Sequence, residues 1–527
     1  MKWSERADIK AIITELDSRA NHRTSYQQSL VMQIQEYPEW ESFVAAHEEA
    51  QRLGIAFNGQ GYDKDLCTTF REFQQVKTSA ARIRVTVAEL ETLIAPLQFM
   101  PEEVLSLIFQ LASIDSRTIP QQIPGHPRSG TAFQPIPLII ASVSRRWRSI
   151  ALKTSALWAN VYVAMARPTC WPQLAIQKSG KRKLEITLDC RAMDCPVAFQ
   201  LDRFLDELLP HVERWSAVSV VADHCKVLDN IGARLALLAS PNLQDIRFTL
   251  TGRGPTEDQH ITIPALFAGG APQLARVRVD SVALSWNSPI LTNLDTLDLR
   301  WLWSDTKLSY GEFHALMKVS PTLTTLVLRG FYVQLLPATN YAPIHAPALR
   351  HLEISGDSVC AMLSLLVTPS LNSLLLANVD ESEFRVLGNF FESSKMSRYP
   401  SLSSLTLLNV KTSKPTPGFL EVMSNITELT IINAGSEDFL AVLRARQECD
   451  DDESCGPVMP AFPYLRNLTL LHDVDPETLL DMVRNRKEHD FPLESLIVHA
   501  GSLGSDFQQQ LQQYLRVDGI YYRIADQ

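Results

Sequence analysis

A short apolar pattern recurs through the C-terminal two-thirds of this chain, and it limits the possible folds more than any other feature. It reads Pro-x-Leu-x-x-Leu-x-Leu, and its five clean copies begin at Pro321, Pro347, Pro369, Pro400 and Pro463. With five weaker copies, the first apolar positions are Leu243, Leu274, Leu294, Leu323, Leu349, Leu371, Leu402, Ile426, Leu465 and Leu493. Successive copies lie between 20 residues (274 to 294) and 39 residues (426 to 465) apart. Such repetition indicates stacked units rather than separate globular domains.

Each copy places one apolar side chain at the turn into a strand and two more at strand spacing. The residues between them, such as His351 and Glu353, then point outward onto a parallel sheet. Helical stretches at 310–319, 384–392 and 476–484 are expected to cover the other side of the sheet. This arrangement is typical of leucine-rich repeats, whose spacing is about 20–29 residues. We therefore predict an α/β leucine-rich-repeat solenoid, an irregular horseshoe with its parallel sheet on the concave face.

Two earlier segments extend the repeats toward the N-terminus. Residues 183–188 and 215–220 alternate as strands do, with a helical stretch at 197–209 between them. They raise the expected total to roughly twelve strands. Four aromatic residues follow strand patterns, where they would either anchor a partner at the rim or belong to the repeat core: Trp301, Trp303, Phe331 and Tyr332.

Residues 100–161 predict a small helical module ahead of the repeats. Pro101 opens the first helix, and Glu102 and Glu103 stand in its first turn, where the helix dipole favours carboxylates. Two apolar stripes follow. The first comprises Val104, Leu105, Ile108, Leu111 and Ala112, with Phe109 at its edge, and the second comprises Ile140, Val143, Trp147, Ile150 and Ala151. The Pro-, Gly- and Ser-rich stretch 115–135 between the helices is expected to be an exposed loop.

This module resembles a known family. Residues 99–109, Phe-Met-Pro-Glu-Glu-Val-Leu-Ser-Leu-Ile-Phe, are similar to the opening of an F-box. Residues 143–151, Val-Ser-Arg-Arg-Trp-Arg-Ser-Ile-Ala, followed by Leu157 and Trp158, are similar to its close. The whole chain resembles fungal F-box proteins with C-terminal leucine-rich repeats, although only the box segments are motif-specific. It departs from the pattern at Met100, where the family usually has leucine, and in its longer loop between the box helices.

The resemblance implies a contact with the Skp-type adaptor of a cullin-RING ubiquitin ligase. By position, the adaptor-binding residues would be Met100, Pro101, Val104, Leu105, Ile108, Val143 and Trp147. Small helices that carry so many apolar groups cannot bury all of them, and such a patch is typical of a protein–protein interface. The alternative is that these residues pack against the rest of the same chain.

The first hundred residues predict three helices, at 1–38, 39–53 and 65–95. Apolar residues at alternating steps of 3 and 4 form a coiled-coil-like seam in the last of these. The seam consists of Phe73, Val76, Ala80, Ile83, Val87, Leu90, Ile94 and Leu97. Self-association through residues 66–97 is possible, but three heptads favour packing within the chain.

Charge and motif content favour a protein partner. The formal net charge of −10 argues against nucleic acid, which needs a concentrated basic surface. The chain shows no nucleophile elbow, phosphate loop, dinucleotide fingerprint or metal-binding histidine pair, so we expect no enzymatic activity and no cofactor or metal. No signal peptide, membrane span or clustered cysteines stand out, so we expect free thiols and a cytoplasmic or nuclear location.

These observations predict a helical region at 1–97, an F-box-like domain at 98–165 and a leucine-rich-repeat domain at 166–527. The leading functional hypothesis is the substrate receptor of a Skp–cullin–F-box ubiquitin ligase in the ubiquitin-like conjugation pathway. In it, the box binds the adaptor and the repeats bind an unidentified target protein. The alternative is a repeat scaffold for protein binding that has no role in ubiquitin transfer.

Overall fold

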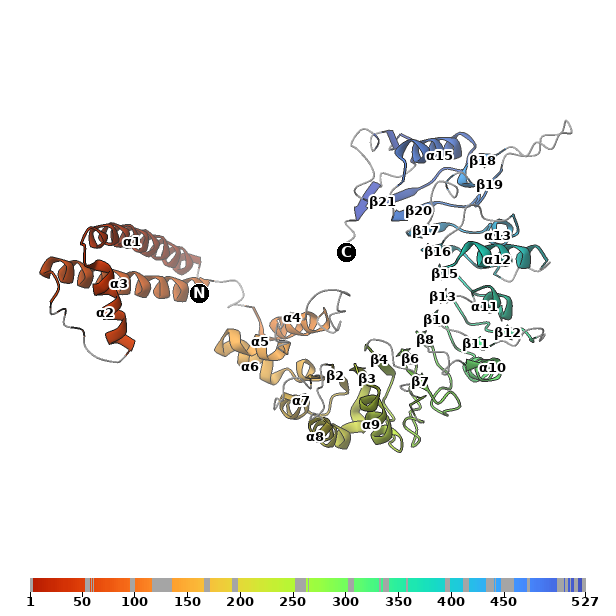
Figure 1. Ribbon diagram of the computed structural model, residues 1–527, viewed down its shortest axis with the longest axis horizontal. Coiled ribbons are helices and arrows are strands. Elements are labelled where there is room, and N and C mark those ends of the chain that lie inside the picture. The colour runs from red at the N-terminus through yellow and green to blue at the C-terminus, as the bar shows by residue number, and fades with distance from the viewer. Residues whose placement is uncertain are drawn as a thin grey trace. The chain divides into compact units, whose positions relative to one another are not determined.

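The computed structural model (Figure 1) divides the chain into two compact units, Met1–Ala151 and Leu152–Gln527. It describes residues 3–523 apart from the gaps at 53–56, 58, 60, 95–99, 116–134, 165–170, 192–197, 252–261, 264, 302–307, 331–332, 335–340, 357–358, 394–398, 411–416, 433–439, 441, 447–458, 472–473, 500–506, 508–509, 512 and 516–519. The sequence predictions for the loop at 115–135, for Leu97 and for Trp303, Phe331 and Tyr332 fall wholly or mostly outside the described residues.

Three helices begin the first unit, as the apolar periodicity predicts: α1 (Trp3–Gln35), α2 (Trp40–Arg52) and α3 (Lys64–Ile94). Helices α1 and α3 pack along each other, and Tyr26 Oη donates a hydrogen bond to Glu72 Oε1 at 2.8 Å between them. A cluster of Ile34, Phe43, Leu66 and Phe70 closes one end. Two members of the predicted seam, Ala80 and Val87, are buried within the chain, which accords with intramolecular packing.

Helices α4 (Glu102–Asp115), α5 (Ile136–Val143) and α6 (Arg145–Lys153) follow. The sequence pattern reads the last two as one helix, but the structure divides them at Ser144. There the backbone is extended, with φ −156° and ψ 165°. The Ser144 hydroxyl accepts a hydrogen bond from the Trp147 backbone N–H at 3.1 Å, as an N-cap does. The break therefore turns Val143 away from the helical stripe to which its spacing assigns it.

The second unit is built on one large sheet of parallel strands with helices packed on it, which confirms the predicted α/β solenoid. In the described residues, this sheet has 14 strands in the order β1-β2-β3-β4-β6-β8-β10-β13-β15-β16-β17-β20-β21-β22. Figure 1 shows the strands on the inner side of the curve that this unit forms, with helices on the outer side. The 14 strands are β1 (Asn160–Ala164), β2 (Leu184–Cys190), β3 (Trp215–Ala222), β4 (Asp245–Leu250), β6 (Arg276–Asp280), β8 (Thr296–Arg300), β10 (Thr325–Arg329), β13 (His351–Ser355), β15 (Ser373–Ala377), β16 (Ser404–Leu408), β17 (Glu428–Ile432), β20 (Asn467–Leu471), β21 (Ser495–His499) and β22 (Ile520–Arg523).

The remaining elements lie between these strands. The helices are α7 (Trp171–Ser179), α8 (Ala198–Leu208), α9 (Cys225–Leu235), α10 (Tyr310–Val319), α11 (Val359–Leu365), α12 (Glu381–Ser393), α13 (Pro417–Val422) and α15 (Pro476–Glu488), with short 3-10 turns at Ser155–Trp158 and Leu209–Arg214. Pairs of two-residue strands are β5 (Thr262–Ile263) with β7 (Ala283–Leu284), β9 (Leu308–Ser309) with β11 (Val333–Gln334), β12 (Ile344–His345) with β14 (Leu366–Val367), and β18 (Ala445–Arg446) with β19 (Met459–Pro460).

The repeated Pro-x-Leu has a clear local cause. In the five clean copies, the backbone N–H of the first leucine donates to the carbonyl of the residue before the proline, at 3.1–3.2 Å. This is a β-turn with proline at its second position, where the ring's fixed φ is already suitable. In each of these copies the strand begins two residues after this leucine. All three apolar positions of every predicted copy are buried, so the repeats share one continuous core.

A second backbone feature recurs at the other end of the strands. Along the neighbouring strands β6, β8, β10, β13, β15 and β16, the residue after the last strand residue adopts a positive φ. These residues are Ser281, Trp301, Gly330, Gly356, Asn378 and Asn409, with φ between 50° and 116°. Glycine and asparagine tolerate this left-handed conformation best, which accounts for four of the six. Ser281 and Trp301 are the two exceptions, and Trp301 is the larger.

Candidate functional sites: an apolar helix surface and an arginine face

Helix α4 is held in place by a small interior and by hydrogen bonds to its first residues. Leu105 is fully buried and its backbone N–H donates to the Pro101 carbonyl at 3.1 Å. Phe109, one turn further on, is also buried and packs against Trp147 of α6, with ring centroids 4.8 Å apart. The guanidinium of Arg146 donates to the Met100 carbonyl, which joins the start of α4 to α6.

Helix α5 exposes three large apolar side chains. Pro137 and Ile140 are buried, whereas Leu138, Ile139 and Val143 are exposed. The guanidinium Nε of Arg148 donates to the Ala141 carbonyl at 2.8 Å, so α6 also supports the end of α5. Arg146 and Arg148 therefore connect the helices through backbone carbonyls.

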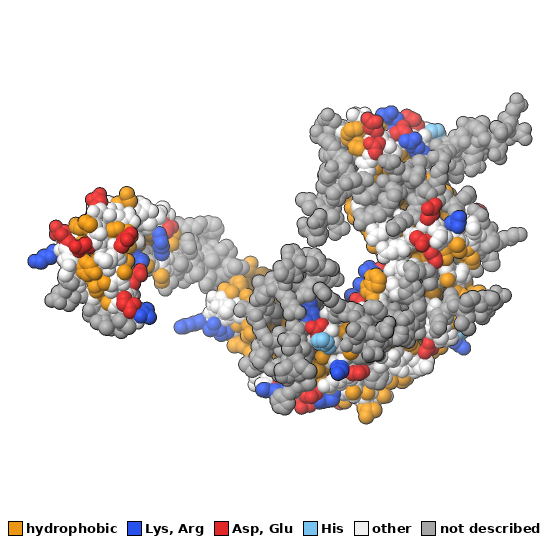
Figure 2. Space-filling view, viewed as in Figure 1, with side chains coloured by type: hydrophobic (Ala, Val, Ile, Leu, Met, Phe, Trp, Pro, Cys, Tyr) orange, Lys and Arg blue, Asp and Glu red, His pale blue; other side chains and the backbone are white. Residues whose placement is uncertain are grey.

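The exposed side chains of α4 and α5 form what we call the apolar surface. It consists of Val104, Leu107, Ile108, Leu111, Leu138, Ile139 and Val143, each at least 40% exposed. These seven lie within 40 residues of sequence, yet they are a large share of the 17 exposed large apolar side chains in the described residues. Figure 2 shows orange apolar side chains over α5 and α6. Scattered exposed leucines are ordinary, but a concentration on two contacting helices is typical of an interface.

The structure distributes the seven sequence-predicted residues among three environments. Four are exposed on or beside the apolar surface: Pro101, Val104, Ile108 and Val143. Met100 and Trp147 are half-buried, and Trp147 contacts Phe109. Leu105 has no exposed surface, so within this chain it supports the apolar surface from beneath.

The predicted adaptor-binding residues omit four members of the apolar surface: Leu107, Leu111, Leu138 and Ile139. Leu111 was assigned to the apolar stripe of the first helix but not to the binding residues. The signal was present in the sequence. Leu107 lies three residues after Val104 and four before Leu111, so helical spacing places it beside the predicted stripe and widens the apolar side of α4. A short helix with so wide an apolar side has more apolar surface than one neighbouring helix covers.

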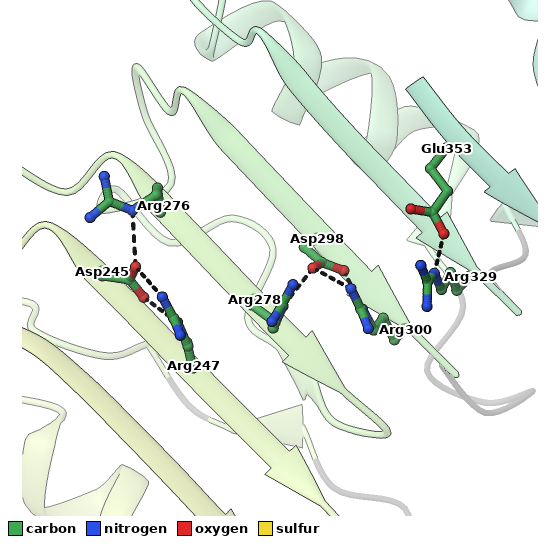
Figure 3. Close-up of polar contacts among 8 residues, drawn as sticks. All are labelled: Asp245, Arg247, Arg276, Arg278, Asp298, Arg300, Arg329 and Glu353. Atoms are coloured by element: carbon green, nitrogen blue, oxygen red, sulfur yellow. Dashed lines mark hydrogen bonds and ion pairs between the residues drawn. The ribbon is translucent and has the colours of Figure 1, made fainter. Parts of the chain in front are cut away.

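A second candidate site lies on the sheet, where outward residues of neighbouring strands form ion pairs (Figure 3). Asp245 accepts from Arg247 Nε and from Arg276 Nε, each at 2.9 Å. Asp298 accepts from Arg278 Nε at 2.5 Å and from Arg300 Nε at 2.7 Å. Arg329 pairs with Glu353. We call the five residues Arg247, Arg276, Arg278, Arg300 and Arg329 the arginine face.

Asp245 and Asp280 lie in a partly dry environment, where burial and charged neighbours act on the pKa of each carboxyl in opposite directions. Burial alone would raise the pKa of Asp245, but hydrogen bonds from Arg247 and Arg276 outweigh it and hold that pKa below its usual value. Asp280 pairs with Arg300 in the strand register, and its pKa is shifted in the opposite direction, above its usual value. Burial raises its pKa, and the Ser281 hydroxyl and Arg300 offset only part of that effect.

The arginine face was also missed by sequence reasoning. Asp-x-Arg recurs at Asp245–Arg247 and Asp298–Arg300, and residues two apart on a strand point to the same side. That spacing could have shown that each aspartate has an arginine neighbour on its own strand. The partners from the next strand, Arg276 and Arg278, depend on the register between strands.

No protein-family model matches the chain, and no curated protein matches it at a significant level. Across the described ranges, no helix has the length and apolar content to cross a membrane. The same ranges contain no group of three or more His, Cys, Asp or Glu side chains placed to hold a metal ion. Of the described cysteines, buried Cys190 has its pKa raised to about 12, chiefly by burial, which keeps it a thiol at neutral pH.

Proposed function

We propose that this protein is a non-enzymatic substrate-recognition subunit of a Skp–cullin–F-box ubiquitin ligase. Helices α4–α6 act as the F-box and bind a Skp-type adaptor through the apolar surface. The parallel-sheet solenoid, which we take to be a leucine-rich-repeat horseshoe, binds the target protein. The ligase's other subunits supply the ubiquitin chemistry, in the cytoplasm or the nucleus.

One observation carries this proposal: four of the seven members of the apolar surface, Val104, Leu107, Ile108 and Val143, lie in the two segments that resemble an F-box, and the other three lie between those segments. Val104, Ile108 and Val143 are about half exposed, so each forgoes part of the roughly 1.5–3 kcal/mol that full burial of such a side chain provides. A partner that covers several of them recovers this free energy on binding. Helix α4 and helix α5 are each supported from beneath, so the surface is formed before a partner arrives.

The hydrogen bonds within α4–α6 also support an F-box role for these helices. The hydrogen bonds from Arg146 and Arg148 end on backbone carbonyls inside the module, and Ser144 caps α6. These contacts fix the angle between the short helices and leave the apolar side chains of α4 and α5 for an outside partner. Ser144, Arg146 and Arg148 of the F-box close therefore have a structural role here. In this proposal, the exposed residues of its opening and of α5, including Val143 at the start of the close, make the contact.

Co-purification of the full chain with a Skp-type adaptor tests the proposal. We expect wild-type protein to retain the adaptor, and Ile108→Asp or Val143→Asp to weaken binding about a hundredfold, because a charge would replace a buried apolar contact. Pro101→Ala and Trp147→Ala should weaken it less, since they act at the edge of the surface and through the position of α6.

The matched control is Val386→Asp, which places the same charge on an exposed helical valine in α12. It should leave adaptor binding unchanged. If the wild-type chain shows no association with the adaptor, the ligase role fails, and the alternative of a repeat scaffold without a ubiquitin role replaces it.

A further inference from the structure

The arginine face exposes cations and hides the anions that hold them. Arg247, Arg276 and Arg278 leave 51%, 49% and 42% of their side-chain surface in solvent. Asp245 and Asp298 beneath them leave only 6% and 4%. A formal count of five arginines against Asp245, Asp280, Asp298 and Glu353 gives a net charge of only +1. What an approaching molecule meets first is nevertheless guanidinium rather than carboxylate.

These ion pairs orient the guanidinium groups but use only some of their N–H donors. Arg276 and Arg278 each donate to their aspartate through Nε, while a guanidinium offers five N–H donors. The aspartates therefore fix the arginine side chains, and part of each fork still faces outward. Side chains that are already ordered lose less entropy when they bind a carboxylate or phosphate oxygen.

Trp301 stands at the edge of this face in a costly backbone conformation. It follows Arg300 at the end of β8, with φ 50°, and its backbone N–H donates to the Arg329 carbonyl at 2.6 Å. At the equivalent strand ends of β15 and β16 the residues are Asn378 and Asn409, which suit this conformation. A tryptophan here costs on the order of 1 kcal/mol more in backbone strain.

Burial does not offset that strain. Two other aromatic residues with positive φ, Phe267 and Phe462, are completely buried, so their packing compensates for the backbone. Trp301 remains 55% exposed. Its ring lies over Gly330, the residue after Arg329, and a Cβ atom at Gly330 would overlap the ring. Gly330 thus leaves room for Trp301 beside the last two arginines of the face.

We propose that the arginine face and Trp301 bind an acidic segment of a partner protein, with acidic side chains on the arginines and an apolar side chain on Trp301. Arginine and tryptophan are the residues most often found at the centres of strong interfaces. This inference deepens the target-binding role proposed for the solenoid and rests on it. It does not depend on adaptor binding, because it concerns only residues of the sheet.

The observations favour a peptide over a nucleic acid. Binding along a phosphate backbone requires an extended excess of basic charge, whereas this face has a net charge of +1 within a chain of −10. Buried carboxylates at regular intervals would oppose a continuous polyanion. Separate carboxylates of a peptide can each meet one pair of arginines. Carboxylate and phosphoserine oxygens share this chemistry, so both are compared as probes.

Fluorescence anisotropy with the purified full chain tests the proposal. The probes are a labelled glutamate-rich peptide ending in phenylalanine, its phosphoserine version, its glutamine version and a single-stranded oligonucleotide of matched charge. We expect at least one acidic peptide to bind, and the glutamine peptide and the oligonucleotide to bind at least about tenfold more weakly. Equal binding of the glutamine peptide, or tighter binding of the oligonucleotide, would overturn the proposal.

Substitutions locate the binding. Arg276→Gln and Arg278→Gln should each weaken acidic-peptide binding about tenfold, the effect expected for loss of a charged hydrogen bond. Each leaves its aspartate paired with a second arginine, Arg247 or Arg300, so the fold should survive. The matched control is Arg466→Gln, which removes an exposed arginine paired with Glu494 elsewhere in the solenoid and should leave binding within about twofold.

Trp301→Asn separates a binding role from a structural one. Asparagine suits the backbone at this position, so thermal stability should stay equal or rise while peptide binding weakens about tenfold. A marked loss of thermal stability with unchanged binding would show that Trp301 is structural and would overturn its part in the proposal. Failure of adaptor co-purification would leave all of these peptide results unaffected, so the two proposals fail separately.

Discussion

The apolar surface and the arginine face are both exposed, but they are prepared for binding in different ways. The apolar surface consists of side chains such as Ile108 and Val143 that no described part of the chain covers, supported by a small interior around Leu105 and Phe109. The arginine face consists of charged side chains fixed by buried aspartates on a sheet whose core is continuous. The first surface gains free energy by leaving water. The arginine face provides oriented, positively charged hydrogen-bond donors.

Under the proposed function, the apolar surface would bind the adaptor, which does not change, and the sheet would bind the target, which can vary. An apolar surface on small helices binds a partner whose shape complements it. A charged face on a repeat sheet can be altered strand by strand, since the outward residues carry none of the core. On β16, β17 and β20 the corresponding outward positions are Thr406, Thr430 and Thr469, in the same register and over the same leucine core. The fold is unchanged while the surface chemistry differs.

The largest expected effect separates core from surface. Leu326→Ala in the sheet core should lower the free energy of unfolding by about 3 kcal/mol, because it leaves a cavity in a fully buried position. Ile108→Ala on the apolar surface should lower it by less than about 0.5 kcal/mol. Chemical denaturation of both variants measures this. If Ile108→Ala destabilised the protein as much as Leu326→Ala, the residue would belong to a core and not to a binding surface.

Salt should separate the two binding events. Raising the ionic strength from about 0.05 M to about 0.5 M should weaken binding of the acidic peptide several-fold, because screening acts on exposed charges. Adaptor binding through apolar contacts should change by less than about twofold over the same range. Parallel titrations with the full chain provide the comparison. A peptide affinity that did not respond to salt would contradict a charge-based arginine face.

Acid should affect two aspartates of the sheet in opposite directions. Because the folded pKa of Asp245 is depressed, its carboxylate stabilises the fold above the unfolded pKa of about 3.9, and this contribution is lost as pH falls through the folded pKa. Because the folded pKa of Asp280 is raised, its ionisation costs stability once the pH exceeds the unfolded value. Unfolding should therefore show Asp245→Asn less stable, and Asp280→Asn more stable, than wild type at neutral pH.

The same pair gives the outcome that would contradict this account. Acidification below about pH 4 should destabilise the Asp245→Asn variant less than it destabilises the wild type, since the variant has already lost that contribution. Identical acid sensitivity of both proteins would show that the ion pairs around Asp245 do not contribute to folding.

The solenoid was predictable because its signal is periodic. Residues such as Leu323, Leu326 and Leu328 repeat ten times with the same spacing, and each copy became one strand of the sheet. The strands β1 and β22 lack that pattern, so they were not predicted. The ion pairs of the arginine face lay beyond the sequence because they depend on register. Asp245 and Arg276 are 31 positions apart in the sequence, and they meet only because the chain between them brings the two strands level.

The helical module was predictable in its residues but not in their exposure. The stripe from Val104 to Leu111 identified a face of α4, yet Leu105 and Phe109 became the interior and the rest of the stripe became the surface. Which side of a short apolar helix is covered depends on the neighbouring helices. The break at Ser144 was also hidden, since a serine within an apolar run is compatible with a helix as well as with a cap.

The most direct test of the central claim is calorimetric titration of a Skp-type adaptor into the full chain at several temperatures. The account predicts saturable one-to-one binding with a negative heat-capacity change, because apolar area is removed from water. Val143→Asp should abolish that signal, and Val386→Asp should preserve it. Absence of binding by the wild-type chain, or binding that Val143→Asp leaves intact, would contradict the claim that the apolar surface is where a partner docks.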